Sequence, residues 1–231
     1  MKIFQRGIQL TQQLFSVCGM RFVARSALTG KRGIMEPRPD RRFEYDTGVI
    51  HGRFQVFHND HLRYLLAGKK LCNHLVVGIT NPDPAAIEEE TADKNRSTLH
   101  ANPLTYYERH QLIRAALVES GVAIEAFTIV PLPISMPDRY RHYVPLDAVF
   151  FLSIYDDWGR RKKQYFESLG LNVHVLWEVE HRDKGLSGSA IREKMAQGQF
   201  WEDTVPSSVA ELLNAWGIPA RLRSIARNEA C

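Results

Sequence analysis

Cysteine is scarce in this chain of 231 residues, which contains three: Cys18, Cys72 and Cys231. An odd number at such wide spacing indicates neither a disulfide framework nor a metal-binding motif, and it favours a reducing compartment such as the cytoplasm. Long apolar runs are missing too, and none approaches the roughly 20 residues of a membrane-spanning helix. With 44% hydrophobic and 24% charged residues, the composition is typical of a globular protein, and no membrane partner is expected.

Acidic residues are absent from residues 1–34, which contain six lysines and arginines. The basic stretch 1–44 is predicted to be an extension outside the fold. It is either a disordered or over-extended start, or a transit peptide that directs the protein to an organelle. Residues 35–231, which include the single domain predicted over 45–231, have 24 of the 30 basic residues and all 26 acidic ones. A domain so close to neutral does not predict nucleic-acid binding.

Short β-rich runs alternate with amphipathic runs along the predicted domain. The predicted strands span 47–54, 74–80, 126–134, 147–154 and 172–179. The predicted helices span 60–72, 105–121, 159–170, 188–198 and 207–217, the last of which closes the chain. This alternation predicts an α/β fold, a Rossmann-like doubly wound parallel sheet of about five strands with helices on both faces.

Ligands of such sheets bind at the carboxyl ends of the strands, near the point where strand order reverses. The crevice is predicted to be formed by residues 52–61, 80–103, 134–146, 155–158 and 181–192. The first segment contains a turn at Gly52 and a helix that starts near Asp60, and a helix N-terminus attracts phosphate. Arg53, His58 and His61 lie in that turn, and the alternative is that the two histidines only cap and pack it.

A second turn of the same kind is "GLSGSAIREKM", residues 185–195. Ser187 and Ser189 offer hydroxyls, and Arg192 projects from the first turn of the predicted helix. Alone, it would be an ordinary serine-capped helix. Two such helix ends at one edge of a sheet predict a polyphosphate site.

Six motifs occur in order after residue 45: "GRFQVFHNDH", "NPLTYYER", "LPI", "SGSAIREKM", "WEDTVP" and "ARLRSI". In these motifs the chain resembles the nucleotidyltransferase superfamily, whose hallmark is His-x-Gly-His after the first strand, and within it the archaeal-type nicotinamide-nucleotide adenylyltransferases. The resemblance implies transfer of a nucleoside monophosphate, AMP from ATP, to a phosphorylated acceptor such as nicotinamide or nicotinate mononucleotide. Pyrophosphate leaves with Mg²⁺, and no covalent enzyme intermediate forms.

The resemblance also implies which residues carry the reaction. His58, His61, Arg53 and Arg192 are the implied catalytic residues, and Mg²⁺ is held mainly by phosphates and water. The implied nucleotide-binding set is Gly52, Arg53, Phe54, Gln55, His58, His61, Ser187, Gly188, Ser189 and Arg192.

Asp60 stands where the motif has glycine. Aspartate is a good N-cap, and a plain cap is one interpretation. The alternatives are that its carboxylate competes with phosphate for the N–H groups, repels the triphosphate or ligates Mg²⁺.

The acceptor region departs further from the motif pattern. The second predicted strand ends "GITNPDP", and no tryptophan follows the "LPI" element. The predicted acceptor-binding residues are Asn81, Asn102, Arg109, Arg139, Tyr140 and Tyr143. For Arg109 the alternative is a surface ion pair with Glu108 or Asp93, and for the two tyrosines it is packing of their loop.

Three functions stay open at this point. The first is the adenylyltransferase above, and the second is a cytidylyltransferase or adenylyltransferase for another phosphorylated metabolite. The third, suggested by Asp60, is a catalytically weak nucleotide-binding regulator. A homo-oligomer is compatible with the sequence, which does not determine the oligomeric state.

Overall fold

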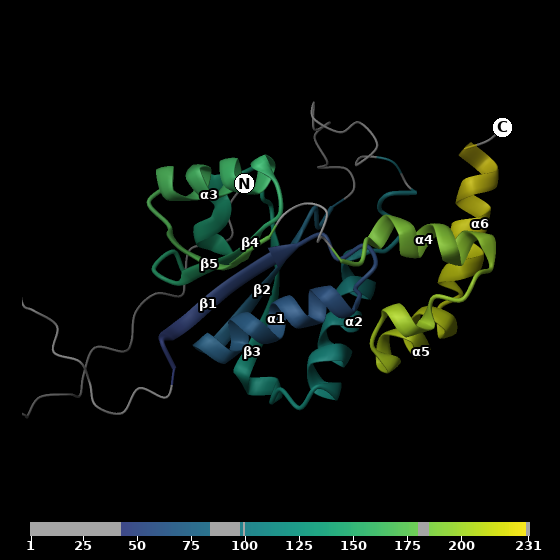
Figure 1. Ribbon diagram of the computed structural model, residues 1–231, viewed down its shortest axis with the longest axis horizontal. Coiled ribbons are helices and arrows are strands. Elements are labelled where there is room, and N and C mark those ends of the chain that lie inside the picture. The colour runs from purple at the N-terminus through teal and green to yellow at the C-terminus, as the bar shows by residue number, and fades with distance from the viewer. Residues whose placement is uncertain (1–42, 84–97, 99, 180–184, 230–231) are drawn as a thin grey trace, which may run out of the picture. The chain divides into compact units, whose positions relative to one another are not determined.

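Five parallel strands form one sheet in the order β3-β2-β1-β4-β5. They are β1 (Tyr45–Gly52), β2 (Cys72–Thr80), β3 (Phe127–Leu132), β4 (Val149–Ile154) and β5 (Asn172–Glu178). The predicted Rossmann-like fold class is therefore confirmed (Figure 1). The computed structural model describes residues 43–83, 98, 100–179 and 185–229. Nearly all of the predicted extension lies outside these residues, so its character stays a prediction.

Six α-helices and three short 3₁₀ helices surround the sheet in the described part of the chain. The α-helices are α1 (Asn59–Leu71), α2 (Tyr106–Glu119), α3 (Asp157–Ser168), α4 (Gly188–Gln197), α5 (Ser207–Ala215) and α6 (Ile218–Glu229). The 3₁₀ helices are η3 (Ile124–Ala126), η4 (Pro137–His142) and η6 (Glu202–Thr204). Among the described residues, no helix has the length and apolar character to span a membrane.

Helix α6 corrects one prediction. A helix over 207–217 does not close the chain, because α6 follows α5 directly. Gly217 has φ +65° and ends α5 in the left-handed region. Pro219 lies in the first turn of α6, where its missing N–H is not needed. A stop signal and a start signal therefore lie two residues apart.

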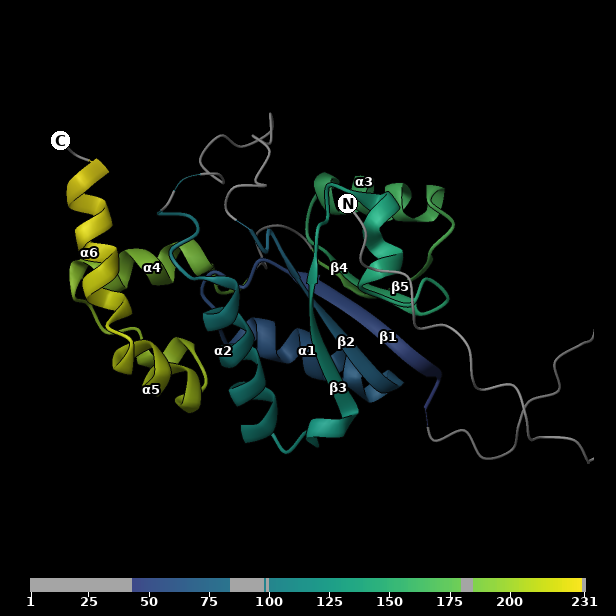
Figure 2. The ribbon, with the colours of Figure 1, turned by 180° about the vertical axis from the view of Figure 1, so that it is seen from behind.

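The two faces of the sheet bury separate apolar cores, because neighbouring strand residues point to opposite faces. Ile50 of β1 belongs to a core shared with α1, α2, α4, α5 and α6. Its neighbour Val49 belongs to a second core, with Phe166 of α3 and Tyr140 of η4. The views in Figures 1 and 2 show α1 and α2 across the sheet from α3. The prediction of helices on both faces is thus confirmed.

Strand β1 lies at the centre of the sheet and fixes the place of the site. The chain runs from β1 to β2 and β3 on one side, and then crosses to β4 and β5 on the other. Strand order therefore reverses between β1 and β4, and a ligand crevice is expected at their carboxyl ends. In Figure 1 the arrow of β1 points toward the start of α4.

Candidate active site

Two adjoining cavities lie at the carboxyl ends of β1 and β4. The clamp cavity, about 410 Å³, lies between the segment from His51 to His61 and the start of α4. The side cavity, about 500 Å³, lies between the ends of the first three strands and helix α3. Both cavities are lined by the same five residues: His51, Gly52, Arg53, Trp158 and Lys162. Ligands in the two cavities would therefore be neighbours.

All ten residues of the predicted nucleotide-binding set line the clamp cavity. They are Gly52, Arg53, Phe54, Gln55, His58, His61, Ser187, Gly188, Ser189 and Arg192. The structure thus brings together the two turns that sequence reasoning singled out. That these residues bind a nucleotide stays a prediction.

Within this set, the side chains of Phe54 and Gln55 shape the turn. Phe54 is buried against Phe57 and His61, with ring centroids 5.7 and 5.1 Å apart. The amide of Gln55 donates to the carbonyl of Leu104 at 2.9 Å and accepts from its N–H at 3.0 Å. Both side chains therefore hold the backbone of the turn.

His58 and His61 form a stacked pair at the N-terminus of α1. Their ring centroids are 3.6 Å apart with an interplanar angle of 23°. His58 is the N-cap, and Nδ1 of His61 accepts a hydrogen bond from the backbone N–H of His58 at 3.4 Å. In a neutral ring, this bond leaves Nε2 of His61 to carry the proton. The structure thus places both histidines at this helix end, where His58 is the cap, and their binding of phosphate stays a prediction.

Burial keeps both rings neutral. It lowers the pKa of His58 to about 4, an effect that the nearby Asp60 carboxylate opposes. Burial, then the neighbouring His58, lowers the pKa of His61 well below its usual value. A hydrogen bond to the backbone of Val56 opposes this shift of the His61 pKa, and each neutral ring carries one N–H near pH 7.

Acid is expected to destabilise the fold through His58. The unfolded chain takes up a proton near the ordinary histidine pKa, whereas folded His58 does so only near pH 4. The unfolded state therefore binds more protons in this interval, and the free energy of unfolding decreases as pH falls through it. Urea unfolding over this range measures the slope, which should be less steep in His58→Gln. Equal slopes for the two proteins would contradict the assignment.

Arg192 ties α4 to the turn after β1. Its buried guanidinium donates through Nη1 to the carbonyl of Gln55 and through Nη2 to Oγ of Ser189, the latter at 3.1 Å. A Cβ at Gly188 would lie 2.7 Å from that same carbonyl, so glycine permits the close approach of α4. Burial, then Arg53, lowers the pKa of Arg192 to about 10, which leaves it charged at pH 7. Two mutually repelling cations favour an anion between them.

Asp60 is not the N-cap, so the capping interpretation is wrong. The cap is His58, and Asp60 lies in the first turn of α1. Its Oδ2 accepts a hydrogen bond from the N–H of Leu186 at 2.5 Å, and its Oδ1 lies 3.7 Å from Nη2 of Arg63. A Cβ at Gly185 would collide with this carboxylate. Asp60 therefore fastens the segment before α4 to the start of α1.

Replacing Asp60 with glycine is expected to raise the KM for the nucleoside triphosphate about tenfold, since a charge-assisted hydrogen bond is lost. Steady-state kinetics measure this effect. Asp60→Asn keeps an acceptor oxygen, so its KM should rise less. Arg63→Ala removes only the ion pair, so its KM should change little. An unchanged or lower KM in Asp60→Gly would instead support competition between the carboxylate and phosphate.

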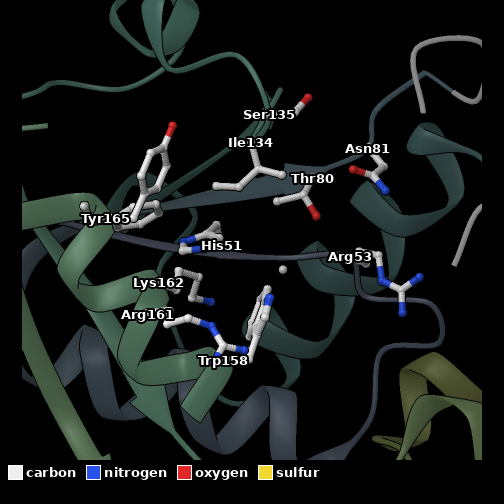
Figure 3. A pocket seen from close by; sticks show the side chains of 12 residues that line it. His51, Arg53, Thr80, Asn81, Ile134, Ser135, Trp158, Arg161, Lys162 and Tyr165 are labelled. Carbon is white, nitrogen blue, oxygen red and sulfur yellow. The ribbon is translucent and has the colours of Figure 1, made fainter. Parts of the chain in front are cut away.

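The side cavity contains residues that the sequence analysis did not single out, although Trp158 lies within the predicted crevice segment 155–158. His51 ends the buried part of β1, and Trp158, Arg161 and Lys162 come from the start of α3. In Figure 3, Arg161 and Lys162 lie across the cavity from Arg53. The ammonium of Lys162 lies 4.8 Å from the ring centroid of Trp158. The sequence feature that could have identified the residues of α3 is the run "DDWGRRKK", which follows a buried strand at the predicted switch point.

Among the predicted acceptor-binding residues, Asn81 lines the side cavity but Arg109 does not. The guanidinium of Arg109 is buried and donates to the carbonyls of Arg53, Thr80 and Asn81 at 3.0, 2.8 and 2.8 Å. The alternative surface pair with Glu108 is also wrong, because Glu108 binds Arg221 at 2.7 Å. The alternative partner Asp93 lies outside the described residues. Arg109 therefore holds the ends of β1 and β2 together.

The other four predicted acceptor residues line neither cavity. Tyr140 is buried, and its hydroxyl donates to the carbonyl of Ile134 at 2.7 Å, so stacking on an acceptor is ruled out for this structure. Tyr143 packs against the same core, which agrees with the packing alternative. Arg139 is exposed on η4, and the amide of Asn102 donates to the carbonyl of Thr98 at 3.1 Å.

Known proteins resemble this chain in sequence over most of its length. The model of the Cytidylyltransferase-like family matches residues 49–194. The phosphonoformate cytidylyltransferase of Streptomyces viridochromogenes is 49% identical over 178 residues, 77% of this chain and 96% of that protein. The nicotinamide-nucleotide adenylyltransferase of Thermococcus kodakarensis is 28% identical over 182 residues, 78% of this chain and 89% of that protein.

A solved structure has the same fold. It is the bifunctional NMN adenylyltransferase/ADP ribose pyrophosphatase of Francisella tularensis, with a TM-score of 0.56 and 17% identity. The match covers 80% of this chain but 53% of that one, so this chain spans about half its length. The family match and the relatives agree with the observed fold. The chain belongs to the cytidylyltransferase-like family and is a nucleotidyltransferase.

Proposed function

We propose that the protein transfers a cytidylyl group from CTP to a small acceptor that carries a phosphonate or phosphate group. The observation that carries this proposal is a clamp cavity, with Arg53 and Arg192, that adjoins a second cationic cavity. The second cavity is of a size for a small acceptor, and Arg161 and Lys162 line it. The choice of CTP and of phosphonate rests on the 49% identity to a phosphonoformate cytidylyltransferase.

The reaction needs no protein nucleophile. An oxygen of the acceptor attacks the α-phosphorus of CTP, the bond between that phosphorus and the bridging oxygen breaks, and pyrophosphate leaves with the electron pair. The neutral rings of His58 and His61 donate hydrogen bonds to the phosphate oxygens on which charge develops. Arg192 and the N-terminus of α4 bind the leaving pyrophosphate. Catalysis is then positioning and charge stabilisation.

Mg²⁺ enters this proposal as part of the CTP substrate. Within the described ranges, no group of three or more His, Cys, Asp or Glu side chains is arranged to hold a metal ion. The carboxylate of Asp60 is engaged by Leu186 and Arg63. Phosphate oxygens and water are ligands that Mg²⁺ prefers, and the bound ion offsets charge on pyrophosphate.

Adenylyl transfer from ATP to nicotinamide or nicotinate mononucleotide is the second candidate. The six sequence motifs and the 28% identity to an archaeal nicotinamide-nucleotide adenylyltransferase support it. Trp158 supports it as well, because it lines both cavities and the residue is 44% exposed. It offers the aromatic face that the "LPI" segment lacks.

A product screen tests the two candidates. The protein is incubated with each nucleoside triphosphate, Mg²⁺ and a panel of acceptors that includes phosphonoformate, methylphosphonate and both mononucleotides, and pyrophosphate release is followed. Release with CTP and a phosphonate supports the proposal. NAD or its deamido form from ATP alone would establish the second candidate. CTP binding in calorimetry without pyrophosphate from any pair would indicate a regulator instead.

A further inference from the structure

His51 is a buried polar residue without a structural partner. Its side chain is 7% exposed, and neither ring nitrogen has a hydrogen-bond partner among the described residues. A buried polar group in this state is costly, and a native structure that contains one calls for an explanation. Its packing contact is the ring of Phe166, with centroids 5.2 Å apart, which leaves the nitrogens unsatisfied.

The imidazole lies where a ligand would reach it. His51 lines both the clamp cavity and the side cavity. Figure 3 shows its ring at the centre of the side cavity, with Lys162 and Arg161 beside it and Arg53 farther along. A bound molecule that extends from Arg53 toward α3 would therefore pass the ring of His51.

The surroundings of His51 favour an anion over a neutral or cationic group. Burial, then the charge of Lys162, lowers the pKa of His51 well below its usual value, so the ring is neutral. A neutral imidazole offers one N–H donor. An oxygen that accepts this bond also lies near the cations of Arg161 and Lys162. A carboxylate or a second phosphonate can accept the hydrogen bond and is attracted by the two cations, whereas a pyridinium ring would be repelled by them.

We propose that His51, with Lys162 and Arg161, binds a second acidic group of the acceptor and so selects acceptors with two acidic groups over acceptors with one. The inference rests on the proposed function, in which the first acidic group of the acceptor, a phosphonate or phosphate, reacts with CTP at the clamp cavity. His51 is then a specificity-determining residue, since it touches the part of the acceptor that does not react. Its contribution falls on the binding of the acceptor.

The test compares two acceptors that differ in the second acidic group. Phosphonoformate has a carboxylate beside its phosphonate, and methylphosphonate has a methyl group there. With CTP, His51→Leu is expected to lower kcat/KM for phosphonoformate roughly ten- to a hundredfold, mostly through KM, because one hydrogen bond to a charged group is lost. For methylphosphonate kcat/KM should change little. Lys162→Met, on the surface of α3, should show the same selective loss without disturbing the core.

The matched control is Val49→Ala. Val49 lies two residues before His51 on the same face of β1 and packs in the core that contains Phe166. Loosened packing alone would lower both acceptors' kcat/KM by the same factor and would leave their ratio unchanged. The proposal is overturned if His51→Leu and Lys162→Met also leave that ratio unchanged.

A binding measurement separates this inference from the proposed function. Phosphonoformate is titrated calorimetrically into the wild-type protein, His51→Leu and Lys162→Met. If no pair of substrates gives pyrophosphate, the proposed function fails, yet weaker binding to both variants still supports the second acidic subsite. Equal affinity for all three proteins overturns the subsite whether or not turnover is seen.

Discussion

Replacing His61 with alanine is expected to lower the rate of nucleotidyl transfer about 100- to 1000-fold, the usual effect of removing one aligned donor to a charged transition state. His61 lines the clamp cavity, and the hydrogen bond at its Nδ1 leaves Nε2 as a donor. Its ring is neutral, so the loss is that of an aligned N–H and not of a full charge. Pyrophosphate release at saturating substrate measures the change in kcat.

The same substitution should leave the chain folded. His61 is partly exposed and forms ring contacts with Phe54, Phe57 and His58. A thermal melt verifies that the variant unfolds cooperatively. His110→Ala on α2 is the matched control, because that half-buried histidine lines neither cavity. An unchanged kcat in His61→Ala would contradict a phosphate-binding role of this helix end.

Replacing Arg109 with methionine is expected to lower the free energy of unfolding by about 3 kcal/mol, because buried carbonyls lose a charged donor. One guanidinium donates to three of these carbonyls at the ends of β1 and β2. Methionine has a similar length and fills the space, so the loss reports the hydrogen bonds. Activity should fall as well, since Arg53 and Asn81 have their backbone fixed by this side chain.

Arg114→Met is the control for Arg109. Arg114 is exposed on the same helix, five residues later, and its replacement should change stability by less than about 0.5 kcal/mol. Urea unfolding of the two variants at one pH makes the comparison. Equal stabilities would show that the Arg109 hydrogen bonds contribute nothing net.

Most of the sheet and one half of the site were predictable from local pattern. A window of a few residues is enough to predict a buried strand, such as residues 147–154. The same holds for the capped helix that starts after Thr105. Thr105 and Glu108 form the predicted capping box, with Oγ1 of Thr105 accepting from the N–H of Glu108 at 3.2 Å. The two turns that line the clamp cavity were also local features. The clamp cavity was predicted because both turns follow strands at the same sheet edge.

The buried position of Arg109 could have been predicted from the helical spacing of the apolar residues around it. The buried residues of α2 are Arg109, Leu112, Ile113, Ala116 and Leu117, which share one face at helical spacing. A charged residue on the apolar stripe of a helix faces the interior, where it needs several acceptors. That spacing argued against an acceptor-binding or surface role.

The partner of Asp60 could not be predicted in the same way. Asp60 and Leu186 are 126 residues apart, and their hydrogen bond depends on how α4 docks. Position within the motif suggested a cap, but the cap is two residues earlier, at His58. A binding role for His51 could not be predicted for a similar reason. A single histidine in a buried strand indicates no site until the residues of α3 that line the same cavity are known.

The contacts between α4 and the turn after β1 have a consequence for synthesis on the ribosome. Gln55 meets Arg192 across 137 residues, and Asp60 meets Leu186 across 126. A nascent chain that has extended only through β4 therefore has the first turn but lacks its opposing wall. Under the proposed function, the complete triphosphate site forms only after α4 has emerged, so nucleotide is expected to stabilise earlier folding intermediates less than the finished domain.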